Sequence, residues 1–164
     1  MPTVSSLVSV SRGATARGRQ PYFVQNVIDI AAAVTANGTA LVAGDIVQAI
    51  TVPANTMVVQ AGIEVLEAVD GSASNDVAVH LGITGVDVDA FVASFDLDAA
   101  TVGTYATSTG TPLIVGATAD TVDLEFDAGT TMPVSGQLRV WAILMDVDAE
   151  NEREADEVDR DQLA

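Results

Sequence analysis

The sequence predicts an all-β fold: an antiparallel β-sandwich, and among sandwiches a jelly roll. Three observations predict it. Apolar and polar residues alternate with period 2 in several segments, turn-forming residues separate these segments, and no strand–helix–strand alternation is present. Eight short strands in this pattern are typical of a jelly roll. An immunoglobulin-like sandwich is the nearest alternative, although its cysteine and tryptophan landmarks are absent.

The expected strands are short and separated by turn signals. They cover residues 22–30, 45–52, 57–68, 76–84, 91–95, 112–116, 121–127 and 137–147. In the segment 121–127, Val122, Leu124 and Phe126 alternate with polar residues, so one face packs on a core and the other meets water. The turn signals are Asn37-Gly38, Pro53-Ala54-Asn55, Asp70-Gly71, Gly110-Thr111-Pro112 and Ala128-Gly129.

Two segments depart from simple alternation. The last expected strand, 137–147, carries apolar residues on both faces, with Trp141 on the face opposite Leu138 and Val140. We therefore expect it to be central in its sheet or buried against a second surface. The alanine run 31–33 is expected to form one helical turn, which Asn37-Gly38 would stop.

Charge divides the chain into three parts. The 23 acidic and 6 basic residues give a formal charge of −17, and all the basic residues are arginines. Residues 1–28 contain Arg12, Arg17 and Arg19 and no acid, whereas the chain from Asp146 onward contains nine acids and two arginines. The sequence predicts an extended basic arm over residues 1–20, a β-sandwich domain over 21–148 and a flexible acidic tail over 149–164.

The composition also indicates an environment and excludes some partners. A lysine-free, aspartate-rich chain is typical of a protein from a salt-saturated cytoplasm, where the Debye length falls to about 3 Å and carboxylate repulsion is screened. An acidic protein of ordinary salt conditions is the alternative. Nucleic-acid binding is not expected because clustered basic residues are missing from the body of the chain. We expect no membrane span, no signal peptide and no disulfide.

No set of residues predicts catalysis. His80 is the single histidine, lysine and cysteine are absent, and His80 occupies a polar position of a regular strand, so we expect it to face solvent. We predict no enzymatic activity and no cofactor. Asp87, Asp89, Asp96 and Asp98 are weak candidates for a Ca²⁺ site, but aspartate pairs arise by composition in this chain, and we expect no metal site.

The basic arm is the segment most indicative of function. Three arginines lie within eight residues, Arg12 to Arg19, and each guanidinium can pair with a carboxylate. An extended segment of this kind can dock on an acidic neighbour. The alternative is an unstructured terminus.

The segments Ile50–Val59, Asp89–Asp98 and Leu138–Val147, in this order, resemble small capsid decoration or cement (head) proteins of tailed viruses. With the salt-adapted composition, the chain resembles such a protein from a haloarchaeal tailed virus. The resemblance implies a β-sandwich, often trimeric, that sits over junctions between major capsid subunits on the surface of a virion assembled in the host cytoplasm.

From this resemblance we expect a homotrimer that binds and stabilises the lattice of the major capsid protein, with no nucleic-acid or membrane partner. The expected capsid-contact residues are Arg12, Arg17, Arg19 and Trp141. The alternative function is a carbohydrate- or receptor-binding β-sandwich module on the virion or cell surface, because jelly rolls often bind sugars through aromatic platforms.

Overall fold

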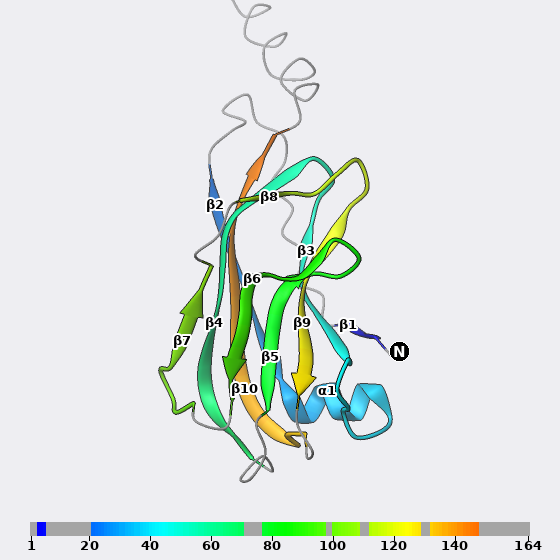
Figure 1. The fold of residues 1–164 in the computed structure, drawn as a ribbon, viewed down its shortest axis with the longest axis vertical. Coiled ribbons are helices and arrows are strands. Elements are labelled where there is room, and N and C mark those ends of the chain that lie inside the picture. The colour runs from blue at the N-terminus through cyan, green and yellow to red at the C-terminus, as the bar shows by residue number, and fades with distance from the viewer. Residues whose placement is uncertain are drawn as a thin grey trace, which may run out of the picture.

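The computed structural model describes residues 3–5, 21–70, 77–97, 100–108, 112–128 and 132–147. Within these ranges it contains strands and one short helix (Figure 1). The elements are β1 (Thr3–Ser5), β2 (Tyr22–Asp29), α1 (Ile30–Asn37), β3 (Ile46–Val52), β4 (Thr56–Asp70), β5 (Ala78–Ile83), β6 (Asp87–Asp96), β7 (Tyr105–Thr107), β8 (Leu113–Ile114), β9 (Asp120–Ala128) and β10 (Ser135–Asp146).

The strands form two sheets with jelly-roll topology. One sheet has the order β1-β3-β9-β5-β6, and the other has the order β2-β10-β4-β7, with β8 also paired to β4. If β7 and β8 are counted as one interrupted strand, the eight strands from β2 to β10 pair antiparallel in nested fashion: first with last, second with seventh, third with sixth and fourth with fifth. This nested pairing is the jelly roll, so the predicted fold class is confirmed.

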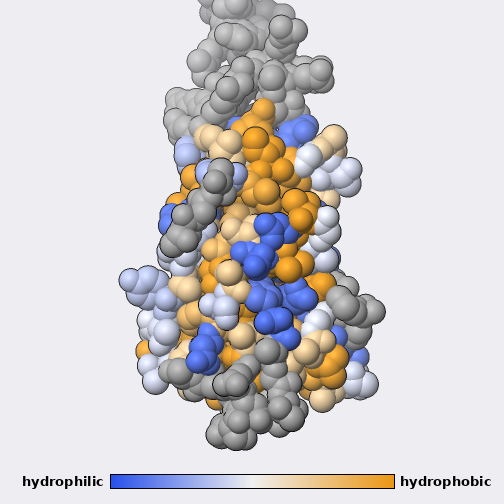
Figure 2. Space-filling model, viewed as in Figure 1, coloured by the Kyte–Doolittle hydropathy of each residue, from blue (hydrophilic) through white to orange (hydrophobic). Residues whose placement is uncertain are grey.

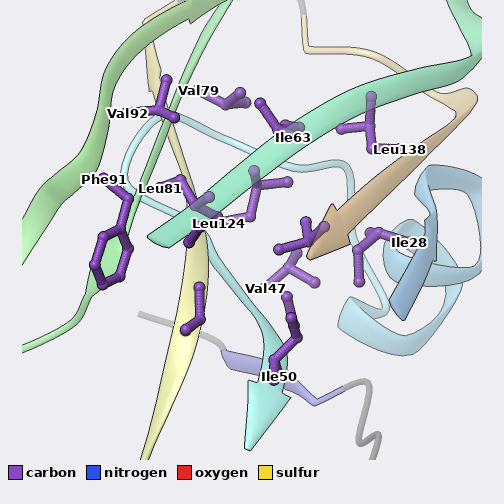
Figure 3. Close-up of a cluster of buried hydrophobic side chains, with 14 of the residues drawn as sticks. Ile28, Val47, Ile50, Ile63, Val79, Leu81, Phe91, Val92, Leu124 and Leu138 are labelled. Carbon is purple, nitrogen blue, oxygen red and sulfur yellow. The ribbon is translucent and has the colours of Figure 1, made fainter. Parts of the chain in front are cut away.

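The core lies between the two sheets and follows the period-2 pattern. Val122, Leu124 and Phe126 of β9 are fully buried, as the alternation predicts. They pack with aliphatic side chains from both sheets, among them Ile63 of β4 and Leu138 of β10 (Figure 3). Most of these side chains are Val, Leu and Ile, which suit the pleated surface of a sheet and fill its interior densely.

The helix α1 is longer than the single turn predicted from the alanine run. The carboxylate of Asp29 accepts a hydrogen bond from Ala32 N at 3.0 Å and caps the N-terminus, and Gly38 adopts φ 74° at the C-terminus. The predicted stop at Asn37-Gly38 is therefore confirmed. Ile30 and Ala33 face the core, so α1 covers one end of the sandwich (Figure 1).

Strand β10 is central in its sheet, between β2 and β4, as the apolar character of both its faces predicts. Three other strands differ from expectation. Neither β1 nor β7 is predicted, because three residues are too few to display an alternation. Strand β6 begins at Asp87 instead of residue 91, because irregular pairing with β5 interrupts its pattern.

The predicted division into arm, domain and tail stays a prediction. Residues 6–20 and 148–164 lie outside the described residues. The backbone of β1, within the predicted arm, pairs in parallel with β3, whereas the remaining pairings are antiparallel.

Candidate interaction surfaces

The outer face of the sheet β2-β10-β4-β7 is rich in apolar side chains. Because the inward positions of these strands fill the core, the alternate positions point outward. Exposed or half-exposed large apolar residues on this face are Phe23, Val27, Met57, Tyr105, Ile114, Trp141, Ile143 and Met145. Near the centre of the face, Arg139 Nη1 pairs with Glu64 Oε2 at 2.9 Å, so this pair adds no net charge. We call this surface the apolar face.

Trp141 and Phe23 form an aromatic pair on the apolar face. Their ring centroids are 5.9 Å apart with an interplanar angle of 24°, a stacked arrangement. The indole lies against Gly62 of β4, and the Phe23 side chain is 58% exposed. The apolar outer side of β10 is therefore not covered by another element within the described residues.

Trp141 is one of the contact residues expected from the sequence, whereas Phe23 is not. The sequence does contain a signal for Phe23, because it is an apolar residue at a position of the expected strand 22–30 where a polar residue would be expected. The arm residues Arg12, Arg17 and Arg19 lie outside the described residues, so the structure does not relate them to this face.

The outer face of the other sheet is acidic. Strand β9 directs Thr121, Asp123, Glu125 and Asp127 outward, at the positions that alternate with its buried apolar residues. Hydrophilic residues gather in the middle of the surface over β5 and β9 (Figure 2). We call this surface the acidic face.

His80 lies on the acidic face but does not face solvent as expected. Its side chain is 15% exposed, and Nε2 lies 3.2 Å from Asp127 Oδ2. The expected exposure to solvent is wrong because β5 lies inside the sheet, between β9 and β6, and the Asp127 carboxylate of β9 lies against the imidazole. Nδ1 is buried and has no hydrogen-bond partner within the described residues.

Asp123 is the one strongly buried carboxyl of this face, only 4% exposed. Its Oδ2 accepts a hydrogen bond from Thr84 N at 3.2 Å. Burial raises the pKa of the Asp123 carboxyl, and the hydroxyls of Thr121 and Thr84 partly oppose that rise. Alternation in the sequence placed this residue on the solvent side, so its burial was not predicted.

Three of the four candidate Ca²⁺ ligands lie within the described residues, and these three do not converge on one point. Asp87 and Asp89 stand at the start of β6 and Asp96 at its end, while Asp98 lies outside the described residues. Asp87 and Asp89 are exposed, and a hydrogen bond with Asp89 raises the pKa of Asp87. Over the described part of the chain, no three His, Asp or Glu side chains converge as metal ligands, and no helix is long and apolar enough to cross a membrane.

The fold and its two outer faces define a class: a jelly-roll protein with one apolar and one acidic outer face. Structural comparison relates this fold to chains from phage capsids. A chain in the capsid of Ralstonia phage GP4 matches with a TM-score of 0.62 and 14% identity, covering 90% of this chain and 99% of that chain. A chain in the capsid asymmetric unit of cyanophage Pam1 matches with a TM-score of 0.58 and 15% identity, covering 85% and 92%.

At these identities the likeness concerns the fold. No protein-family model matches the sequence, and no curated protein matches it either. The nearly complete coverage of both chains means that each neighbour is a chain of similar length, built around one such jelly roll.

Proposed function

We propose that this chain is a structural virion protein: a capsid decoration or cement protein of a tailed virus with a haloarchaeal host. It binds the major capsid protein at the surface of the particle, as a homotrimer, and stabilises the lattice. The observation that supports this role is the match, over nearly the full length of both chains, to small chains of phage capsids. The lysine-free acidic composition supports the halophilic host. The proposal includes no enzymatic activity.

The apolar face is the proposed contact with neighbouring subunits of the particle, with Trp141 at its centre. An exposed apolar patch of this kind marks an interaction site on a folded protein. Phe23 and Trp141 supply the aromatic side chains that are enriched at the centres of interfaces. The capsid protein of a halophilic virus is expected to be acidic, as this chain is. The apolar face suits contact with such a protein, because its Arg139–Glu64 pair carries no net charge and so brings no like charges together at the interface.

The arm residues Arg12, Arg17 and Arg19 are proposed as the second contact. Each can pair with a carboxylate of a neighbouring subunit. Pairs that stay exposed are worth only about 0–1 kcal/mol each, and salt weakens them further. The arm therefore contributes to attachment where neighbouring subunits cover its arginines.

Two measurements on virions test the role. Antibody labelling of purified particles, imaged by negative stain, is expected to place this protein on the capsid, and its absence from the particle would contradict the proposal. The second measurement is the occupancy of variant proteins on particles stripped of the wild-type protein. Phe23→Ser is expected to lower occupancy, since it removes an exposed side chain of the apolar face.

The matched control is Val86→Ser. Val86 is also an exposed apolar residue, 64% exposed, but it lies in the turn between β5 and β6 of the other sheet. It is expected to keep wild-type occupancy. If both variants fold and reach the same occupancy, the proposal that the apolar face contacts the capsid is contradicted.

A carbohydrate- or receptor-binding module is the second candidate function. The observation that favours it is the stacked Phe23–Trp141 pair, which is accessible on the sheet surface instead of buried. A glycan array probed with the wild-type protein and with Phe23→Ser tests this function. Selective binding that the substitution abolishes would favour it over the cement role.

A further inference from the structure

The acidic face contains a cluster of buried oxygen atoms that the described residues do not satisfy. Asp123 Oδ1, Thr84 Oγ1 and Thr121 Oγ1 are each buried without a hydrogen-bond partner in this part of the chain. Both hydroxyls lie close enough to the Asp123 carboxyl to influence its pKa, yet neither forms a hydrogen bond of good geometry with it. Unpartnered buried oxygens are rare in proteins, and an ion or a water is a common reason for them.

The local fold explains why this carboxyl is buried. Gly82 of β5 is the cross-strand partner of Asp123. The β6 backbone at Asp87 and Val88 passes directly over Gly82, and the carbonyl oxygens of both residues are among the atoms that a Cβ at Gly82 would meet. Thr84, which donates its backbone N–H to Asp123, holds the intervening turn in place. Gly82 therefore lies between the Asp123 carboxyl of β9 and the carbonyl oxygens of β6.

A carboxyl held out of water is stabilised either by a proton or by a compensating positive charge, because an unpaired buried charge is costly. Arg139 is the one Arg among the described residues, and it pairs with Glu64 on the opposite sheet. His80 pairs with Asp127 instead. Asp120 adds further negative potential near Asp123. Within the described residues, no protein cation neutralises Asp123.

We propose that this cluster binds a hard, oxygen-coordinating cation, with Asp123 Oδ1 and the hydroxyls of Thr84 and Thr121 as ligands. Hard cations such as Na⁺, K⁺ and Ca²⁺ take carboxylate, hydroxyl and carbonyl oxygens as ligands. Softer transition metals prefer imidazole or thiolate, which this cluster lacks. The site is independent of the proposed role in the capsid, and it ties the β5–β6 turn to β9.

The test is thermal unfolding of the full chain at fixed ionic strength in four chlorides. Sodium, potassium and calcium chloride are compared with tetramethylammonium chloride, whose cation screens charge but is too large for a buried oxygen site. At least one metal cation is expected to raise the Tm above its value in tetramethylammonium chloride. The rise should grow with the logarithm of that cation's concentration, as binding to the folded state requires. The cation that does so identifies the occupant.

Asp123→Asn keeps the size of the side chain and removes its charge, so the difference between cations is expected to disappear. Asp127→Asn is the matched control: it lies on the same strand and face but is 51% exposed, and it should keep the difference. If Asp123→Asn does not fold, Thr121→Val serves as the second variant and should weaken the cation effect.

Equal Tm values in all four salts would overturn the proposal, since a proton or a water on Asp123 gives no preference among cations. A preference that survives both Asp123→Asn and Thr121→Val would overturn it as well, because the responsible site would then lie elsewhere.

Discussion

The indole of Trp141 lies directly on Gly62, the residue paired with it on the neighbouring strand β4. A Cβ atom at Gly62 would stand 2.5 Å from Cζ2 of the indole and 2.7 Å from the carbonyl oxygen of Ala106. Gly62 thus leaves the space in which the indole lies flat against the sheet and beside Phe23. The position of the aromatic pair depends on this glycine.

Replacing Gly62 by alanine is expected to displace the indole and to destabilise the fold by about 1–3 kcal/mol, the usual cost of overpacking. Trp141 is the only tryptophan in the chain, so its fluorescence reports the displacement directly. The control is Gly116→Ala, because a Cβ at Gly116 meets nothing within 4 Å. An unchanged emission spectrum and an unchanged Tm for Gly62→Ala would contradict the contact.

Salt is expected to control stability. With a formal charge of −17 on 164 residues, lowering the salt from molar to millimolar concentration removes the screening between carboxylates. The Tm should therefore fall on dilution, even when tetramethylammonium chloride is the only salt. A Tm that is the same at both concentrations would count against adaptation to high salt.

Deleting residues 1–20 is expected to leave the sandwich folded and to weaken attachment to particles. The eight strands of the jelly roll begin at Tyr22, and within the described residues the deletion removes the three-residue strand β1. Circular dichroism and the Tm measure the fold, and occupancy on particles measures attachment. Unfolding of the truncated protein would show that the arm is an essential part of the domain.

Replacing Arg12, Arg17 and Arg19 together by alanine is expected to reduce occupancy on particles without a change in Tm. Each pair contributes little alone, but many identical copies on one shell multiply a small loss per site. The comparison is made with the wild-type protein at matched salt. Equal occupancy would leave the apolar face around Trp141 as the better candidate for the contact.

The sequence was sufficient for the fold but not for the environment of each side chain. Alternation in β9 correctly predicted which residues fill the core, because period 2 assigns each residue to one face of a strand. It does not reveal what covers the outward face. Asp123 and His80 are both outward-facing and largely buried, since the β5–β6 turn and the neighbouring strands shield them.

The Phe23–Trp141 pair is a second case in which sequence alternation does not reveal the surroundings of a side chain. Apolar residues on both faces of the last strand correctly predicted a central position for β10. The sequence does not indicate that Phe23 is a neighbour of Trp141, because the two residues are far apart in the chain and only the register of β2 against β10 brings them together. The short strands β1 and β7 carry too few residues for any periodic signal.

The parallel pairing of β1 has a consequence for solubility. Without β1, the backbone N–H and C=O groups on one side of β3 from Ile46 to Gln48 would form an open edge of the sheet. An unpaired edge is a template for strands of other molecules, and such pairing leads to aggregation. Strand β1 thus protects this part of the sheet from pairing with the sheets of neighbouring molecules, a protection that matters most where many copies are concentrated.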